Sequence, residues 1–348
     1  MSPTAVTTNT GAAPPPLPNP STGSANPSAS FPALWGYLQP ALDHIVRSPT
    51  NNPAKAPAIT VSYHMGVHTA VYNYFTSQSE GPAPAHAAAG LTTVSRGGGG
   101  GGGDKGRASG TGTDLYEHLD RYYTDAAREL FLGAPTDDTT LVHYLVPCFN
   151  RYAAGAQAVS RLLNYVNRHY VKRAADEDRG WLRLSDVLDA VARTIQETDT
   201  REQIQQRLRE RRTQELKKWG YEDGAGPAAL AQAEAYAEAA SPPDRVVSLS
   251  ALAYRRFRIE VIDPLLTVPK IKGKGKKKKP PSHGDKPPMP RGRLARAVKE
   301  LLESKGGDGE EKLRLSGELA ICLRTVGVKV DHPLRKKLDK YIPRSDSK

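Results

Sequence analysis

Residues 59–77 carry apolar and aromatic side chains at helical spacing, and this pattern limits the fold more than any other feature of the chain. Val67, Val71 and Tyr74 fall on one side of a helix with 3.6 residues per turn, which predicts that this side is buried. A second side of the same helix holds four residues of other types: His64, Met65, His68 and Tyr72.

The second side of this helix has two interpretations. Methionine, histidine and tyrosine combine contact area with polar tips, a combination that is typical of a surface that binds a partner. Stripes of aromatic residues and methionine at helical spacing more often fill protein interiors. The spacing alone therefore favours core packing and leaves a binding surface open.

Most of the remaining foldable chain also has helical periodicity, and alternating strand patterns are nearly absent. Residues 152–173 predict a further helix, with Tyr165 and Arg168 one turn apart on it. Five predicted helices between Leu34 and Arg173 favour an all-α fold built as an antiparallel bundle. Pro40 predicts a kink or a restart within the first of these helices.

Capping residues predict where the middle helices begin and end. Asp114 is expected to cap a helix that stops at Gly133, and Asp137 or Asp138 is expected to cap the next one. That fourth helix is expected to give way to the fifth near Gly155.

Pro-rich and Gly-rich segments divide the chain. Residues 1–30 have almost nothing to bury, which predicts a disordered tail. A run of seven glycines lies in residues 79–112, and because no strand precedes it and the GxxxxGK[ST] pattern is missing, it predicts a flexible loop rather than a phosphate-binding one. Residues 182–245 continue in a helical pattern, and 267–292 form a basic linker rich in Pro, Gly and Lys.

The motifs of common enzyme classes are missing from the sequence. It contains no HExxH, CxxC or GxSxG pattern, and its nine histidines are dispersed, so neither a metal site nor a cofactor is expected. Cys148 sits between Pro147 and Phe149 in an apolar helical segment, which predicts a buried, inert thiol. These observations favour a binding module or scaffold over an enzyme.

The net charge of +12 depends strongly on residues 270–279, KIKGKGKKKK. Such a run can contact phosphates, serve as a nuclear import signal or remain a solvated linker. A helical protein associated with nucleic acid through this run is therefore the alternative function. We find no pattern of a signal peptide or of an apolar membrane span, and only two cysteines, so the cytoplasm and nucleus are the expected locations.

Four strings stand in this order along the chain: VYNYFTS (71–77), LYEHLDRYY (115–123), LNYVNRHYVKR (163–173) and RRFRIEVIDPLL (255–266). The most specific of them contains the pattern Tyr-x-Asn-Arg-His-aromatic-Val-x-Arg. Together they resemble the N-terminal region of cullins, and most closely that of the cullins that scaffold F-box ubiquitin ligases.

The resemblance implies an elongated all-helical scaffold of five-helix cullin repeats that acts without catalysis in ubiquitin-dependent protein catabolism. Residues 31–266 would form the first repeat, with the glycine-rich loop and the 182–245 insertion inside it, and residues 293–348 would start the second. The first repeat of a cullin binds a BTB/POZ-fold adaptor that carries F-box substrate receptors. By position, the adaptor-binding residues would be His64, Met65, His68, Tyr72, Tyr165 and Arg168.

Two features depart from the family pattern. His64 and His68 stand where relatives often carry aromatic residues, which affects the expected affinity for, or choice of, adaptor. A full cullin continues into a half that holds the RING subunit, and that half does not fit within 348 residues, so no RING partner is expected. On this interpretation the chain is a fragment, a truncated product or a competitor that sequesters adaptors.

Overall fold

The computed structural model describes residues 26–50, 52–79, 112–268, 292–304 and 309–341. Within these ranges every regular element is a helix and no strand occurs, so the predicted all-α class is confirmed. The expectations for the N-terminal tail, most of the glycine-rich loop and the lysine run lie outside the described residues. No described helix is both long and apolar enough to span a membrane.

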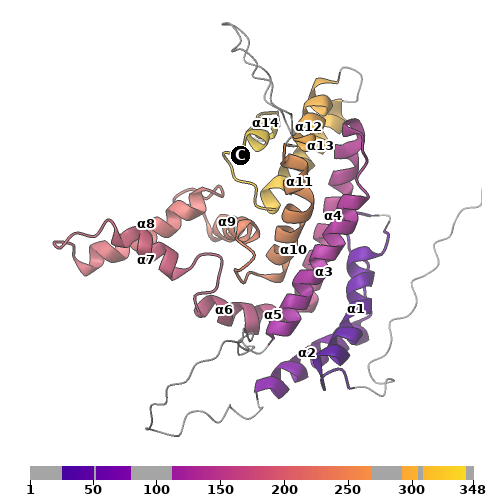
Figure 1. The fold of residues 1–348 in the computed structure, drawn as a ribbon, viewed down its shortest axis with the longest axis horizontal. Coiled ribbons are helices and arrows are strands. Elements are labelled where there is room, and N and C mark those ends of the chain that lie inside the picture. The colour runs from indigo at the N-terminus through magenta and orange to yellow at the C-terminus, as the bar shows by residue number, and fades with distance from the viewer. Residues whose placement is uncertain (1–25, 51, 80–111, 269–291, 305–308, 342–348) are drawn as a thin grey trace, which may run out of the picture.

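Four long helices form the first part of the molecule: α1 (Phe31–Arg47), α2 (Val61–Ser79), α3 (Thr113–Leu132) and α4 (Asp138–Leu162). The helix α4 runs through the centre of the assembly and contacts α1, α10, α12 and α13 along its length (Figure 1). Helix α1 begins where the Ser30 hydroxyl accepts a hydrogen bond from the Ala33 N–H. It continues without interruption past Pro40, so the predicted restart does not occur.

The predicted cap of α3 is wrong. The helix begins at Thr113 after Gly112, and Asp114 lies inside the first turn rather than at the N-cap. Gly112 has φ 88°, a left-handed conformation that costs glycine little, and a Cβ at this position would overlap the ring of Phe75. Contact with α2 therefore fixes where α3 starts, and the Asp114 carboxylate remains close to the positive end of the helix dipole.

The predicted boundary at Gly155 is also wrong, because α4 passes through this residue and ends at Leu162. A Cβ on Gly155 would lie 3.2 Å from both the Ile45 carbonyl oxygen and the Val46 Cα. The glycine thus permits α1 to cross closely over α4, and the helix breaks at Leu163 instead. Three short segments continue the path: α5 (Asn164–Val166), the π-helix η1 (Asn167–Val171) and α6 (Lys172–Asp176).

The second part of the chain returns to α3 and α4. It comprises α10 (Leu249–Phe257), η2 (Arg258–Ile262), α11 (Asp263–Leu266), α12 (Arg293–Glu303), α13 (Gly309–Thr325) and α14 (Pro333–Tyr341). Buried Tyr152 joins the two parts, since its hydroxyl donates a hydrogen bond to the Ala253 carbonyl oxygen over 3.0 Å. One hydrophobic core joins α1–α6 to the end of α9 and to α10–α14, without residues of α7 or α8, and the predicted division between repeats at 267–292 stays a prediction.

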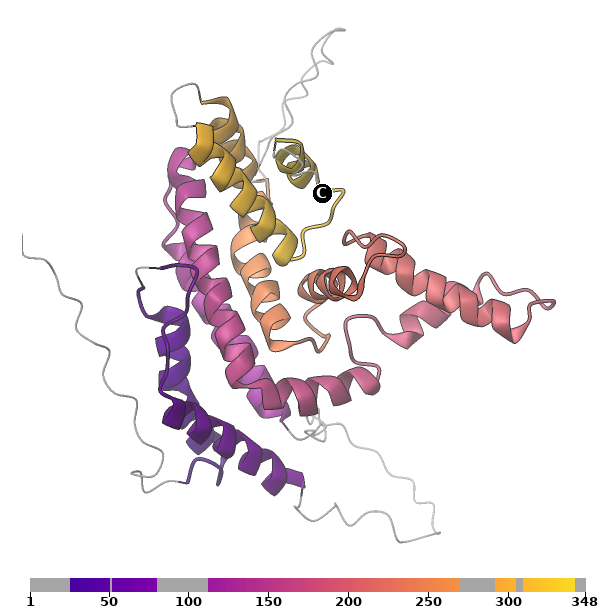
Figure 2. The same cartoon turned by 180° about the vertical axis from the view of Figure 1, so that it is seen from behind.

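Residues 182–245 are helical, as the sequence predicts. They contain α7 (Leu184–Ala192), α8 (Arg201–Lys217) and α9 (Pro227–Ala240). Helices α7 and α8 pair as a hairpin that projects from the bundle, and α9 leads back to α10 (Figures 1 and 2). We call α7, α8 and the turn between them the arm.

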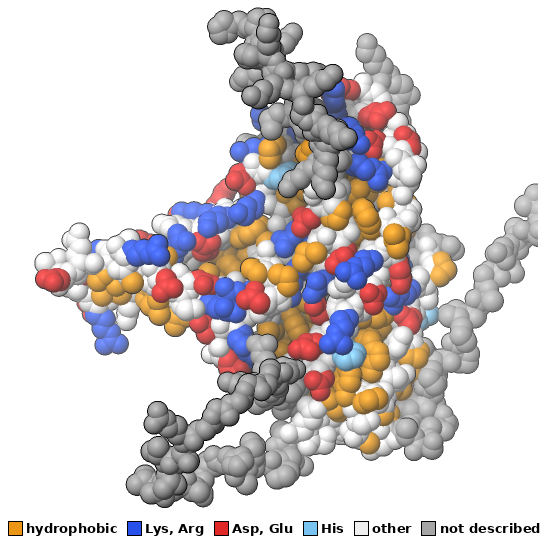
Figure 3. All heavy atoms as spheres, viewed as in Figure 1, with side chains coloured by type: hydrophobic (Ala, Val, Ile, Leu, Met, Phe, Trp, Pro, Cys, Tyr) orange, Lys and Arg blue, Asp and Glu red, His pale blue; other side chains and the backbone are white. Residues whose placement is uncertain are grey.

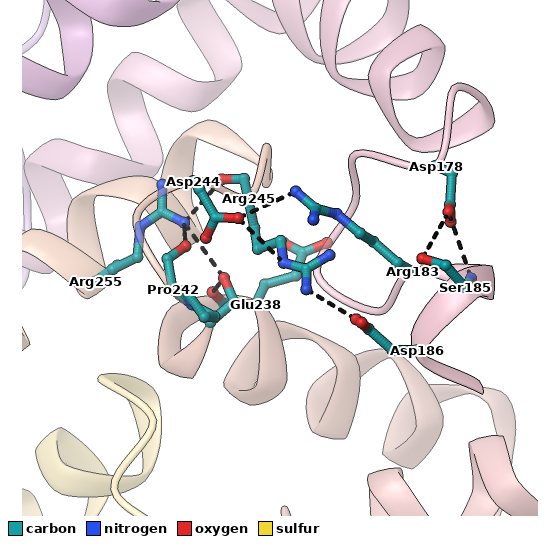
Figure 4. Close-up of polar contacts among 10 residues, drawn as sticks. Asp178, Arg183, Ser185, Asp186, Glu238, Pro242, Asp244, Arg245 and Arg255 are labelled. Atoms are coloured by element: carbon teal, nitrogen blue, oxygen red, sulfur yellow. Dashed lines mark hydrogen bonds and ion pairs between the residues drawn. The ribbon is translucent and has the colours of Figure 1, made fainter. Parts of the chain in front are cut away.

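A polar network fixes the base of the arm (Figure 4). Arg255 is 1% exposed and donates hydrogen bonds to the carbonyl oxygens of Pro242 and Arg245, both over 2.9 Å. Arg245 in turn donates to Asp186 at the start of α7 over 2.8 Å. The Asp178 carboxylate accepts hydrogen bonds from the first turn of α7, which lowers the pKa of this carboxyl group. The arm is therefore tied to α10 by specific contacts.

Candidate interaction surface

Helix α2 separates its residues onto two faces as its spacing predicts. Val67, Val71 and Tyr74 are 0%, 1% and 3% exposed and pack in the core. The four candidate residues on the other face are all exposed, among them Met65 at 57% and Tyr72 at 46%. The interpretation of this face as core packing is therefore wrong, and α2 presents methionine, histidine and tyrosine to solvent.

Contacts at its N-terminus hold α2 in place. The Thr60 hydroxyl accepts a hydrogen bond from the Tyr63 N–H over 3.3 Å, and the Tyr63 hydroxyl donates to the Tyr37 carbonyl oxygen over 2.7 Å. Tyr63 is 4% exposed, and burial raises the pKa of its phenol. These buried contacts fix the rotation of α2 about its axis, so its exposed face has a defined orientation.

Tyr165, on α5, joins the α2 face to the segment that follows α4. Its ring centroid lies 5.6 Å from that of Tyr72 and 6.2 Å from that of His68, both in edge-on geometry. Phe75, from the buried side of α2, also contacts it at 5.3 Å. Burial raises the pKa of the Tyr165 phenol. Two candidate segments that are ninety residues apart in sequence thus form one surface.

The structure adds His169 to this surface, a residue that the sequence interpretation missed. Its ring stacks on Tyr165 at 4.0 Å between centroids. The signal was available, since His169 follows Tyr165 by four residues and helical neighbours at this spacing share a face. We call His68, Tyr72, Tyr165 and His169 the aromatic cluster.

The other candidates lie outside these ring contacts. Met65 is exposed on the same face of α2, and Arg168 is exposed on η1 without an ion pair to any described residue. His64 borders a concavity of about 480 Å³ between the 54–59 segment and α4. Of the six candidates, His68, Tyr72 and Tyr165 are in contact with one another through Tyr165. Met65 lies beside them on α2, and His64 and Arg168 are peripheral.

The exposed face of α2 is built from aromatic, histidine and methionine side chains. Helix α2 has no Asp, Glu, Lys or Arg, so its exposed face offers aromatic and sulfur contacts without a charged group. Among the described residues, no group of three His, Cys, Asp or Glu side chains is arranged to hold a metal ion. Large side chains fixed by neighbouring rings lose little conformational entropy when a partner covers them.

Asn167 explains one part of the distinctive 163–173 string. Its side-chain amide oxygen accepts a hydrogen bond from the Leu249 N–H over 3.0 Å, and its amide nitrogen donates to the Ser160 hydroxyl over 3.0 Å. Asn167 thereby ties η1 to the start of α10 and to the end of α4. The polar residues of this string therefore serve the fold as well as the surface.

Cys148 differs from its prediction, because it is half-buried rather than buried. Burial still raises the pKa of its thiol, and a protonated thiol is a weak nucleophile. Cys322 is buried, and the pKa of its thiol is also raised.

Comparison of the chain with protein-family models, with curated proteins and with solved structures finds no significant match in any of the three.

Proposed function

We propose that this chain is a non-catalytic scaffold of the cullin type, which binds a BTB/POZ-fold adaptor that carries F-box substrate receptors. One observation supports the proposal most directly. Of the six residues that the resemblance assigns to adaptor binding, the four on α2 are exposed, and two of these, His68 and Tyr72, contact Tyr165 from the second segment.

The size of the exposed side chains fits a binding anchor. Burying a side chain such as Met65 contributes about 1.5–3 kcal/mol when it passes from water into an apolar contact. Tyrosine is enriched among the residues that dominate binding energy, and Tyr72 is already oriented by Tyr165. A partner with an apolar pocket can therefore gain substantial affinity from these two side chains without rearranging α2.

Calorimetric titration of the full chain with a purified BTB/POZ-fold adaptor of the F-box type tests the proposal. We expect micromolar or tighter binding, which a His68→Ala, Tyr72→Ala double variant weakens at least about tenfold, or 1.4 kcal/mol. The matched control is Asn73→Ala, because Asn73 is exposed on the same helix but lies away from the candidate face. If circular dichroism shows that the protein is folded and it still does not bind, the proposal of adaptor binding is rejected.

The alternative, association with nucleic acid through residues 270–279, predicts a different result. Duplex DNA would bind with an affinity that falls steeply as salt rises, and deletion of the ten residues would abolish it. The His68→Ala, Tyr72→Ala variant would bind DNA like the unchanged chain. Measurements on the same variants therefore distinguish adaptor binding from DNA binding.

A further inference from the structure

The arm carries a line of exposed apolar side chains that its own packing does not use. Leu184 is 58% exposed, Leu188 is 45% exposed and Ile195, in the turn after α7, is 42% exposed. Leu184, Leu188 and Ala192 recur every four residues, which places them in one row along α7. We call Leu184, Leu188, Ala192 and Ile195 the apolar row.

The hairpin forms its own small core from other residues. Val187 and Val191 are 6% and 4% exposed, while Ile204 and Leu208 on α8 are half-buried. Helix α7 packs directly on α8. Because the buried valines lie beside the apolar row rather than within it, the exposed leucines are not required to hold the two helices together.

The turn of the hairpin is held by specific polar contacts. The Arg207 guanidinium donates to both Asp199 carboxylate oxygens, over 2.7 and 2.8 Å, and to the Thr194 carbonyl oxygen over 2.6 Å. Thr200 and Gln203 form a reciprocal capping box at the start of α8. The apolar row is therefore presented on a fixed support, which lowers the entropy cost of binding.

Cations follow α8 alongside this row. Arg201, Arg209 and Arg212 lie on one ridge of the helix, with the uncharged Gln205 between the first two. Arg212 pairs with Glu234, but Arg201 and Arg209 make no ion pair with any described residue. Figure 3 shows Lys and Arg side chains along the upper edge of the arm and hydrophobic side chains below them.

We infer that the arm binds an amphipathic helix of about three turns that carries acidic residues along one flank. Leu184 and Ala192 are eight residues apart on α7, which is about 12 Å at 1.5 Å per residue, and Ile195 extends the row beyond the end of the helix, so the row suits a partner helix of about three turns. The partner's apolar stripe would cover Leu184 and Leu188. Its acidic flank would lie against Arg201 and Arg209, whose charges are otherwise unpaired within the described chain.

The charges argue against a membrane as the occupant. Asp189 and Glu197 are exposed on α7 and in the turn, close in sequence to Leu188 and Ile195, so a flat anionic lipid surface that covered the apolar row would meet both carboxylates. A helix can instead direct its acidic flank to the arginines of α8 alone. A second copy of the chain is also less suitable, since a stable dimer buries about 1,200 Å² or more, and three exposed large side chains on each copy supply a small part of that area.

Fluorescence anisotropy with two labelled helical peptides of 16 residues tests the inference on the full chain. Both peptides carry the same leucine stripe, and they differ only in whether one flank is glutamate or lysine. We expect the glutamate peptide to bind at least tenfold more tightly at low salt, with the difference narrowing as salt rises. Equal affinity for the two peptides, or no binding of either, would overturn the inference.

Three variants and one control separate the apolar and charged contributions. Leu188→Asp is expected to remove detectable binding, and Leu184→Asp repeats the test at a more exposed position. Arg201→Glu with Arg209→Glu should weaken the glutamate peptide at least tenfold and reverse the preference between peptides. Lys336→Glu with Lys337→Glu on α14 makes the same change in net charge and should leave both affinities unchanged.

Two other outcomes would assign the row to a different occupant and reject the helix. Self-association in sedimentation that Leu188→Asp abolishes, together with absent peptide binding, would assign it to a second copy. Co-flotation with phosphatidylserine vesicles that depends on Leu188, again without peptide binding, would assign it to lipid. The inference uses no residue of α2 or of the aromatic cluster, so its result is independent of the proposed adaptor.

Discussion

Individual tyrosines show how the same side chain serves different purposes in this protein. Tyr72 is exposed and available for contact, whereas Tyr37 and Tyr63 are buried side by side with ring centroids 5.1 Å apart. The Tyr63 hydroxyl has an acceptor in the Tyr37 carbonyl oxygen. The Tyr37 hydroxyl is buried with no hydrogen-bond partner among the described residues. Substitutions at these two positions should therefore differ in their cost.

Tyr63→Phe should lower the free energy of unfolding by about 1 kcal/mol at pH 7, because it removes a buried hydrogen bond. Tyr37→Phe should change it by less than about 0.5 kcal/mol, since the lost hydroxyl has no partner. Chemical denaturation of both variants measures the difference. Equal destabilisation by the two substitutions would show that the hydroxyl of Tyr37 is bound in solution.

The same pair predicts a dependence on alkaline pH. Burial raises the pKa of Tyr37 to about 12, from an ordinary value of 10.0. The unfolded chain therefore loses this proton first as pH rises above about 10, and stability should fall from there until the folded phenol also ionises. Tyr37→Phe should lose less stability than the unchanged chain between pH 9 and pH 11.5. An identical loss in both proteins would contradict the assignment.

At the scale of helices, Gly112 and Gly36 illustrate opposite effects of the same substitution. Gly112 sits at the junction between α2 and α3 with a positive φ and with the Phe75 ring in the place of a Cβ. Gly36 lies inside α1, where a Cβ would meet nothing within 4 Å. The conformational cost of alanine thus depends on the element in which the glycine occurs.

Gly112→Ala should destabilise the protein by about 1–3 kcal/mol through backbone strain and displacement of Phe75. Gly36→Ala should stabilise it by about 0.5–1 kcal/mol, because alanine favours the helix and reduces the freedom of the unfolded chain. Thermal unfolding of the two variants measures both effects. A stabilising Gly112→Ala would show that α3 can begin without the left-handed residue.

Helical periodicity predicted the elements of this fold better than it predicted their ends. The alternation of faces on α2 could be predicted from Val67, Val71 and Tyr74 because burial follows the helical period. The cap at Gly112 depends on Phe75, and the passage of α4 through Gly155 depends on α1, more than a hundred residues earlier. Such contacts are long-range, so local rules of capping and helix termination could not supply them.

The candidate site was likewise only partly predictable from the sequence. The four α2 residues were predictable from spacing, but their exposure was not, since the same stripe of methionine and aromatic residues also suits a core. The approach of Tyr165 to Tyr72 is a tertiary contact that only the resemblance implied. The exposure of the apolar row on α7 could not be predicted from the sequence. Leu184 and Leu188 are aliphatic like the buried valines beside them, so residue type does not distinguish the exposed side chains from the buried ones.

At the scale of the whole molecule, the aromatic cluster and the arm occupy different parts of the fold. Helix α2 lies at one end of the bundle, and the arm projects from its side in both views (Figures 1 and 2). Two separate surfaces of one chain can bind two partners at once. If the chain is the scaffold that we propose, these two surfaces would bring an adaptor and a second, helical partner into one complex.

The two surfaces should therefore act independently. Leu188→Asp should leave adaptor affinity within about twofold, and the His68→Ala, Tyr72→Ala variant should do the same for the acidic peptide, because distant sites without shared contacts have nearly additive energies. Titration of the adaptor into protein saturated with the peptide measures this directly. A change of fivefold or more would correspond to a coupling of about 1 kcal/mol. Since coupling is reciprocal, the peptide would then bind with an equally altered affinity to the adaptor complex, and the two surfaces would have to communicate through the bundle between α2 and the arm.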